Sequence, residues 1–133
     1  MVCIQCSSKT KVVNSRPQLR SNQVWRRRQC VKCQATFTSE EAVNYQMTWL
    51  VKSRSGALEP FSRDKLFLSL HKTCQHRKTA LADAGALTET IIHKLSGRVS
   101  NGVIASREIV QLAQVALNRF DGAASVAYGA FHA

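Results

Sequence analysis

Hydrophobic residues recur with helical spacing in the second half of the chain. The clearest helix is predicted to begin after Ser106, with Glu108 in its first turn. Apolar residues at i, i+3, i+4, i+7, i+8 and i+11 share one face of it: Ile109, Leu112, Ala113, Ala116, Leu117 and Phe120. Asp121 and Gly122 interrupt this pattern, and residues 123–131 are expected to form a short final helix.

Two further helices are predicted before this one. Ser62 is expected to cap the first, which has Asp64 in its first turn. Its apolar side is formed by residues at helical spacing: Leu66, Phe67, Leu70 and Cys74. The next helix is expected to end at Gly97 and to carry an apolar face of its own: Leu87, Ile91, Ile92 and Leu95.

A β-hairpin is predicted ahead of these helices. Residues 49–52 and 58–61 are rich in aromatic and aliphatic side chains typical of strands, and Ser55-Gly56 between them is a turn signal. The second part of the chain is therefore expected to be a β-hairpin that caps a four-helix bundle.

The first 40 residues have a different composition, rich in Cys, Arg and turn-forming residues. Residues 10–13 and 23–26 predict short strands, and residues 15–17 and 21–22 predict turns. The composition changes near residues 37–41, so the domain boundary is expected between about Thr38 and Met47. We therefore expect an α+β protein with two domains, at residues 1–40 and 47–133.

Four of the five cysteines form two identical pairs, Cys3-x2-Cys6 and Cys30-x2-Cys33. Each C-x2-C turn can direct two thiolates at one ion, and two such turns complete a tetrahedral site. The pattern predicts a zinc ribbon whose zinc is structural, because four thiolates close the coordination shell. The alternative is that the two pairs occur by chance or are structural thiols that bind no metal. Cys74 lies at helical spacing with apolar residues and is expected to be a buried apolar side chain.

Positive charge dominates the chain, with 19 Lys and Arg against 8 Asp and Glu, a formal net charge of +11. Such an excess indicates a polyanionic partner: nucleic acid, a nucleotide or an anionic membrane. Because no apolar stretch approaches a membrane span or signal peptide, we expect a cytoplasmic protein without membrane contact. The Arg26-Arg27-Arg28 run next to the second cysteine pair, with Arg16 and Lys11, predicts DNA binding. A merely solvated basic face is the alternative.

A second cluster of cations surrounds the predicted hairpin. Lys52, Arg54 and Lys65 lie near the flexible Gly56 turn, and clustered cations of this kind bind nucleoside triphosphates. The sequence has no G-x-x-x-x-G-K-[ST] loop, so P-loop hydrolysis is not supported. The four histidines have no ligand spacing and are assigned no metal.

Several motifs occur together in a characteristic order. They are the two cysteine pairs, Thr-Lys-Val-Val-Asn-Ser-Arg at 10–16, Val24 to Cys33 followed by Phe-Thr at 37–38, and Leu-Val-Lys at 50–52 with Glu-Pro-Phe at 59–61 and Lys-Leu at 65–66. In this order they resemble the bacterial NrdR repressors of ribonucleotide reductase genes, which join a zinc ribbon to an ATP-cone. The chain differs from the family in several places. The interval from Lys52 to Pro60 is one residue longer, so either the hairpin turn is enlarged or Arg54 moves to contact the phosphates. Asn14 and Trp25 replace an acidic and a basic residue of the family pattern.

The resemblance implies a non-enzymatic transcriptional repressor that senses ATP and dATP. In the family the nucleotide changes how protomers assemble, and some homo-oligomers present paired ribbons to operator repeats in double-stranded promoter DNA within the nucleoid. The resemblance assigns zinc to Cys3, Cys6, Cys30 and Cys33, and DNA to Arg26, Arg27 and Arg28 with Arg16. It assigns the nucleotide to Val51, Lys52, Glu59 and Lys65.

Two other functions remain open from the sequence. The chain could be a fragment or accessory subunit of a nucleotide-regulated enzyme, such as the cone of a ribonucleotide reductase. It could also be a constitutive DNA binder whose cone serves only for oligomerisation.

Overall fold

The computed structural model describes residues 1–132 and divides the chain into two compact units, Met1–Val43 and Asn44–Ala133. Ala133, the last residue of the second predicted domain, lies outside the described residues. The first unit is built from strands and the second from helices with a small sheet, which confirms the α+β class.

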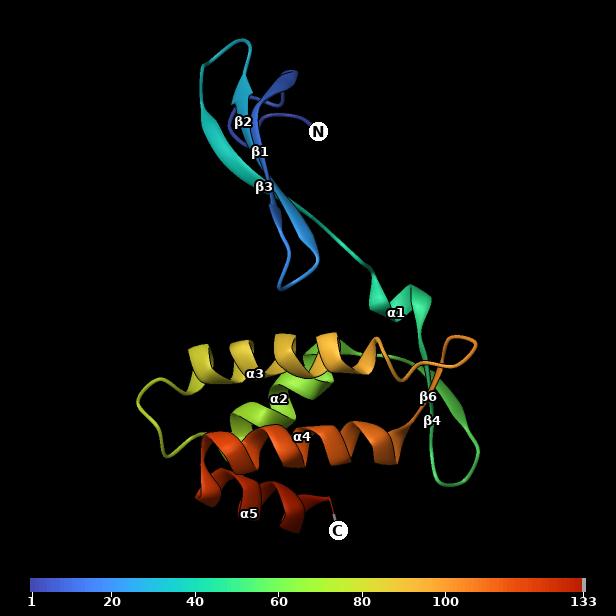
Figure 1. Cartoon of the computed structure of the whole chain (residues 1–133). Helices are drawn as coiled ribbons and strands as arrows, with labels where there is room; N and C mark the ends of the chain where they lie inside the picture. Colours follow the sequence, from blue (N-terminus) through green and yellow to red (C-terminus); the bar gives the residue numbers. More distant parts are fainter. Residues whose placement is uncertain (133) are drawn as a thin grey trace. The chain divides into compact units, whose positions relative to one another are not determined.

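The first unit is an antiparallel three-stranded sheet in the order β1-β2-β3 (Figure 1). Its strands are β1 (Thr10–Gln18), β2 (Gln23–Cys30) and β3 (Thr36–Ala42). The predicted turn at residues 15–17 is wrong, because these residues continue β1 and pair with β2. Pro17 is compatible with a strand here because β1 is an edge strand, where a missing N–H breaks no ladder. Strand β3 was not predicted.

The second unit begins with α1 (Tyr45–Thr48) and the expected hairpin, β4 (Leu50–Lys52) and β5 (Leu58–Pro60). A third strand that was not predicted, β6 (Val103–Ala105), pairs with β4 in parallel. The chain enters β6 through Gly102, whose φ of +73° is readily adopted only by glycine. The hairpin is therefore part of a mixed sheet in the order β5-β4-β6.

Four longer helices follow the sequence predictions with altered ends: α2 (Arg63–Thr73), α3 (Ala80–Leu95), α4 (Ser106–Phe120) and α5 (Gly122–Phe131). Helix α2 packs on α3 and α5, and α4 packs on the same two helices, so the four form a closed bundle (Figure 1). The Ser62 hydroxyl accepts a hydrogen bond from Lys65 N at 3.2 Å, which confirms the predicted cap. Asp121 caps α5 in the same way, through Ala124 N at 3.1 Å.

The core of this unit contains most of the predicted apolar faces. Cys74 is fully buried, as expected, and burial raises the pKa of its thiol. Phe120 departs from the prediction: its side chain is 38% exposed and lies under the Arg77 guanidinium, 4.5 Å from the ring centroid. Among the described residues, no helix is both long and apolar enough to cross a membrane.

Candidate functional site

The four paired cysteines converge at one end of the first unit. Their Sγ atoms all lie within 4.8 Å of one another, and no disulfide joins them. Cys3 Sγ is 3.6 Å from Cys33 Sγ, and Cys6 Sγ is 3.5 Å from Cys30 Sγ. Four sulfurs at 2.3 Å from a central ion would be separated by about 3.8 Å, so the cluster has the size of a tetrahedral thiolate site.

The two cysteine turns have the same backbone geometry. Cys3 N donates to Ser8 O at 2.8 Å, and Cys30 N donates to Ala35 O at 2.9 Å, five residues further on in each case. The residue after the second cysteine is left-handed in both turns, with φ of 61° at Ser7 and 65° at Gln34. Such backbones cost free energy for non-glycine residues. Their repetition indicates that the turns are built to hold the thiols together.

Backbone N–H groups point at the sulfurs. Gln5 N donates to Cys3 Sγ at 3.3 Å, and Lys32 N donates to Cys30 Sγ at 3.3 Å. Hydrogen bonds of this kind stabilise thiolates over thiols. Backbone donors at Cys6 and Gln5 lower the pKa of Cys3, and hydrogen bonds from Ser8 lower that of Cys6 to about 6. Cys33 differs: a backbone hydrogen bond from Ala35 favours its thiolate, but desolvation and the neighbouring thiols raise its pKa to about 11. The convergence of all four sulfurs, with two of them favouring the thiolate, fits a metal that binds thiolate sulfur.

The predicted DNA-binding cations lie on two faces of the sheet, and a β-bulge decides which face each one takes. The register between β1 and β2 shifts between Val12 and Asn14, so the alternation of β1 side chains reverses there. Residues paired across antiparallel strands point to the same face. Lys11 pairs with Gln29 before the bulge, and Arg16 pairs with Trp25 after it.

By this register Lys11, Arg16 and Arg27 lie on one face, together with Trp25; we call it the tryptophan face. Arg26 and Arg28 point to the opposite face. Without the bulge Arg16 would lie there too. A hollow of about 210 Å³ on the tryptophan face is lined by Asn14, Arg16, Trp25, Arg27 and Thr38.

The arginines of the opposite face have protein partners. Arg26 Nη1 lies 3.6 Å from the Glu41 Oε2 carboxylate oxygen, whereas Arg28 Nε donates to the neutral Ser39 hydroxyl at 3.0 Å, so within residues 1–132 only Arg26 of the two is near an opposite charge. Arg27, on the tryptophan face, donates only to hydroxyl groups, at 2.9 Å to Thr36 and 3.3 Å to Thr38. Its charge is therefore not neutralised by these contacts.

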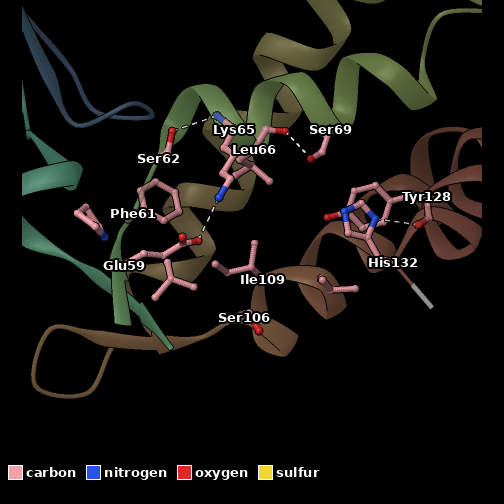
Figure 2. A pocket seen from close by; sticks show the side chains of 13 residues that line it. Glu59, Phe61, Ser62, Lys65, Leu66, Ser69, Ser106, Ile109, Tyr128 and His132 are labelled. Atoms are coloured by element: carbon pink, nitrogen blue, oxygen red, sulfur yellow. Dashed lines mark hydrogen bonds and ion pairs between the residues drawn. The ribbon is translucent and has the colours of Figure 1, made fainter. Parts of the chain in front are cut away.

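The second unit contains a pocket of about 260 Å³ between the hairpin and helices α2, α4 and α5 (Figure 2). Its walls combine apolar and hydroxyl side chains with one lysine, one glutamate and one histidine: Val51, Glu59, Pro60, Phe61, Ser62, Lys65, Leu66, Ser69, Ser106, Ile109, Val110, Tyr128 and His132. Lys65 Nζ lies 3.2 Å from Glu59 Oε1 at the pocket edge.

Of the residues predicted for the nucleotide, the pocket brings together Val51, Glu59 and Lys65. Lys52 and Arg54 are exposed and do not line it. Lys52 follows Val51 along β4, so its side chain points to the opposite face of the small sheet.

The comparisons with known proteins cover both units. The family described as "Transcriptional repressor NrdR-like, N-terminal domain" matches residues 1–41, and the "ATP cone domain" matches residues 50–129. Proteins named "Transcriptional repressor NrdR" from Streptococcus pneumoniae strains Hungary19A-6 and R6 are each 32% identical over 128 residues, which cover 90% of this chain and 81% of theirs. The chain belongs to the NrdR family. Its relatives are named as transcriptional repressors, which is a non-enzymatic role.

Within this NrdR-family chain, sequence reasoning missed the part of the pocket that comes from the last helix. The Tyr128 and His132 rings are stacked with centroids 4.0 Å apart, and both line the ATP-cone pocket (Figure 2). Tyr128 is buried, which raises the pKa of its hydroxyl. The i, i+4 spacing of two rings near the chain end was the only available signal.

Proposed function

We propose that this chain is a zinc-dependent DNA-binding repressor whose DNA affinity responds to ATP and dATP. The supporting observation is that one chain carries both a four-thiol ribbon and a cone pocket, within a family whose members are named transcriptional repressors. The ribbon supplies DNA contacts, and the cone supplies nucleotide control.

In this proposal Cys3, Cys6, Cys30 and Cys33 hold one zinc ion. The first unit has few buried apolar side chains apart from two of the cysteines, so the metal must supply much of its folding free energy. Comparable small domains gain an apparent ~10–16 kcal/mol from zinc. Four thiolates leave no open coordination position, so the zinc is structural.

The polyanionic partner is double-stranded DNA. Of the five cations predicted for it, Lys11, Arg16 and Arg27 share the tryptophan face and are the proposed phosphate contacts, while Arg26 and Arg28 lie on the opposite face. We propose that the targets are operator repeats in promoters of ribonucleotide reductase genes, on the nucleoid in the cytoplasm. Phosphate contacts from Lys and Arg supply affinity, and the planar guanidinium groups can also read guanine edges.

The cone pocket is the proposed site of the adenine nucleotide. Its apolar and aromatic walls, which include Phe61, Ile109 and Tyr128, suit a purine ring. Lys65 at the edge supplies charge for the phosphates. Lys65 is the only one of the three predicted hairpin cations that lines the pocket, so Lys52 and Arg54 are not used as phosphate ligands in this proposal.

Nucleotide and DNA are coupled through a homo-oligomer. If one nucleotide favours the assembly that presents ribbons at operator spacing, its differential affinity sets the change in DNA occupancy. A coupling of ~1–3 kcal/mol gives about a 5- to 150-fold change in DNA affinity.

An electrophoretic mobility-shift titration on reductase promoter DNA tests this function. The zinc-loaded chain should bind with clearly different affinities in ATP and in dATP. Lys65→Ala should remove this difference, while Lys94→Ala, an exposed lysine of α3 outside the pocket, should keep it. Equal affinity of the wild-type chain in both nucleotides contradicts nucleotide control and supports a constitutive binder. Absence of DNA binding contradicts the whole proposal.

A further inference from the structure

The ribbon exposes one large aromatic side chain on its central strand, two residues from the start of β2. Trp25 is 42% exposed, whereas Trp49, the other tryptophan, is 7% exposed in the core of the cone. Trp25 pairs with Arg16 on one side and with Glu40 on the other. The indole therefore lies between the two outer strands of the tryptophan face, where an apolar ring exposed to water is costly.

The polar atom of this indole is already satisfied. Trp25 Nε1 donates to Gln23 Oε1 at 3.0 Å. The ring therefore presents only its carbon atoms to a partner. The hydrogen bond to the Gln23 side chain fixes the orientation of the ring. A partner of this surface must offer an apolar group at that point.

The surroundings of Trp25 require the same partner to be negatively charged. Lys11, Arg16 and Arg27 share its face, and Glu40 is the one carboxylate that the register places there among the described residues. Arg16 has no hydrogen-bond or ion-pair partner within residues 1–132, and Arg27 is bound only by threonine hydroxyls. On the opposite face, by contrast, Arg26 is paired with Glu41.

Duplex DNA offers both features in its major groove. Phosphates line the groove, and the thymine 5-methyl is the apolar group on the base edges there. We propose that the tryptophan face is the side of the ribbon that enters the major groove, and that Trp25 reads thymine by packing on its 5-methyl group. This inference rests on the proposed DNA-binding function and adds a specificity residue to it.

The hollow beside the indole supports a base-reading role for this face. Asn14, which pairs with Arg27, lines it together with Arg16 and Trp25. Asparagine is the residue that reads adenine in the major groove, and arginine reads guanine. The bulge between Val12 and Asn14 brings these groups onto the face of Trp25, so the register assembles a set of base-reading side chains on that face.

The test compares operator DNA with thymine and the same DNA with deoxyuridine, which lacks only the 5-methyl group. Binding of the zinc-loaded wild-type chain is measured for single substitutions across the operator. The expected loss is about fourfold for each contacted methyl, the value of one buried methyl-sized group. Trp25→Ala should bind more weakly and should no longer distinguish the two bases at those positions.

Val12→Ala is the matched control, because Val12 is 45% exposed on the opposite face. It should retain the full thymine dependence. Zinc content and circular dichroism of each variant show that the ribbon is folded. Trp25→Phe, which keeps an apolar ring, should recover part of the methyl effect.

Trp25 fluorescence provides a second readout. DNA should change the emission of the wild-type chain and leave that of Trp25→Phe, which reports only buried Trp49, nearly unchanged. Wild-type binding that ignores the thymine methyl at every position overturns the inference while leaving DNA binding intact. Tighter binding to single strands, or loss of oligomer in Trp25→Ala with unchanged thymine dependence, overturns it as well. No DNA binding overturns the proposed function too.

Discussion

Lys65 Nζ lies 3.2 Å from Glu59 Oε1 at the edge of the cone pocket, and the two side chains are 72% and 57% exposed. An ion pair with this exposure contributes little stability, because water screens it and both side chains lose rotamer freedom. Lys65 can therefore exchange the carboxylate for a phosphate at small cost.

Lys65→Ala is expected to weaken ATP and dATP binding about tenfold or more, since a hydrogen bond to a charged group is worth ~1.5–3 kcal/mol. The melting temperature of the helical unit should hardly change. Isothermal titration calorimetry checks the first point and circular dichroism the second. Lys94→Ala is the control and should match the wild type. Unchanged nucleotide affinity in Lys65→Ala places the phosphates elsewhere.

Removal of the metal should affect the two units differently. A strong chelator, or the substitution Cys30→Ser, is expected to unfold the ribbon and abolish DNA binding, because four thiols without zinc cannot hold the three strands. The cone has its own hydrophobic core and should keep its helices and its nucleotide affinity. Metal analysis with far-ultraviolet circular dichroism measures this, with Cys74→Ala, an apolar substitution of the buried cysteine outside the cluster, as the comparison. A chelated chain that still bound DNA would contradict the structural role of zinc.

The salt dependence of DNA binding shows whether DNA contacts one basic face of the ribbon or both. The slope of log K against log salt is about −0.9 for each phosphate neutralised on duplex DNA. The three cations of the tryptophan face predict about −2.7 per ribbon, and all five predicted cations would give about −4.5. We expect the smaller slope, with Arg27→Ala reducing it by about one unit and Arg26→Ala changing it little. The reverse order for these two variants would show that the opposite face binds phosphate.

Asp121 links the end of α4 to the loop after α2. Its Oδ2 lies 2.9 Å from His76 Nε2 and 3.1 Å from Arg77 Nη1. The hydrogen bond from His76, then the backbone N–H of Ala124 and Arg77, hold the pKa of Asp121 well below its usual range. A lowered carboxyl pKa contributes stability that is present above the unfolded pKa of about 4 and is lost as pH falls towards the folded pKa.

Asp121→Asn should therefore lower the stability of the helical unit at pH 7, and the difference from wild type should shrink as the pH falls from 5 to 2. The amide oxygen still caps α5, so Asp121→Ala should be less stable than Asp121→Asn. Thermal denaturation followed at 222 nm over this pH range measures both. Asp64→Asn removes an aspartate that has no ion pair within residues 1–132 and should show a smaller effect. A pH-independent loss in Asp121→Asn would argue against the ion pairs.

Local patterns in the sequence predicted the parts of the fold that depend on local physics. The cysteine spacing, the cap at Ser62 and the apolar stripe of α4 each involve residues within a few positions of one another. Strand β6 pairs with β4 across about 50 residues, and nothing in the sequence near Val103 indicates that partner. Strand β3 is mostly polar, and its local sequence resembles a linker; only its pairing with β2 makes it a strand.

The candidate sites likewise combine features that the local sequence predicts with features that depend on long-range packing. The four thiols were identified in full from spacing, whereas the faces of the arginines depend on a one-residue bulge in β1 that no local pattern reveals. Tyr128 and His132 join the pocket through packing of α5 against the rest of the bundle. Such long-range packing is not encoded in the local sequence around either residue.

The most direct test of nucleotide-controlled DNA binding asks the reverse question, namely whether DNA changes the affinity of the chain for each nucleotide. The affinities of ATP and dATP for the zinc-loaded chain are measured by calorimetry, first alone and then with saturating operator DNA. Because coupling is mutual, DNA should change the ratio of the two nucleotide affinities by the factor by which the nucleotides change DNA affinity. We expect a shift of at least about fivefold. Identical nucleotide affinities with and without DNA would show that the cone and the ribbon act independently.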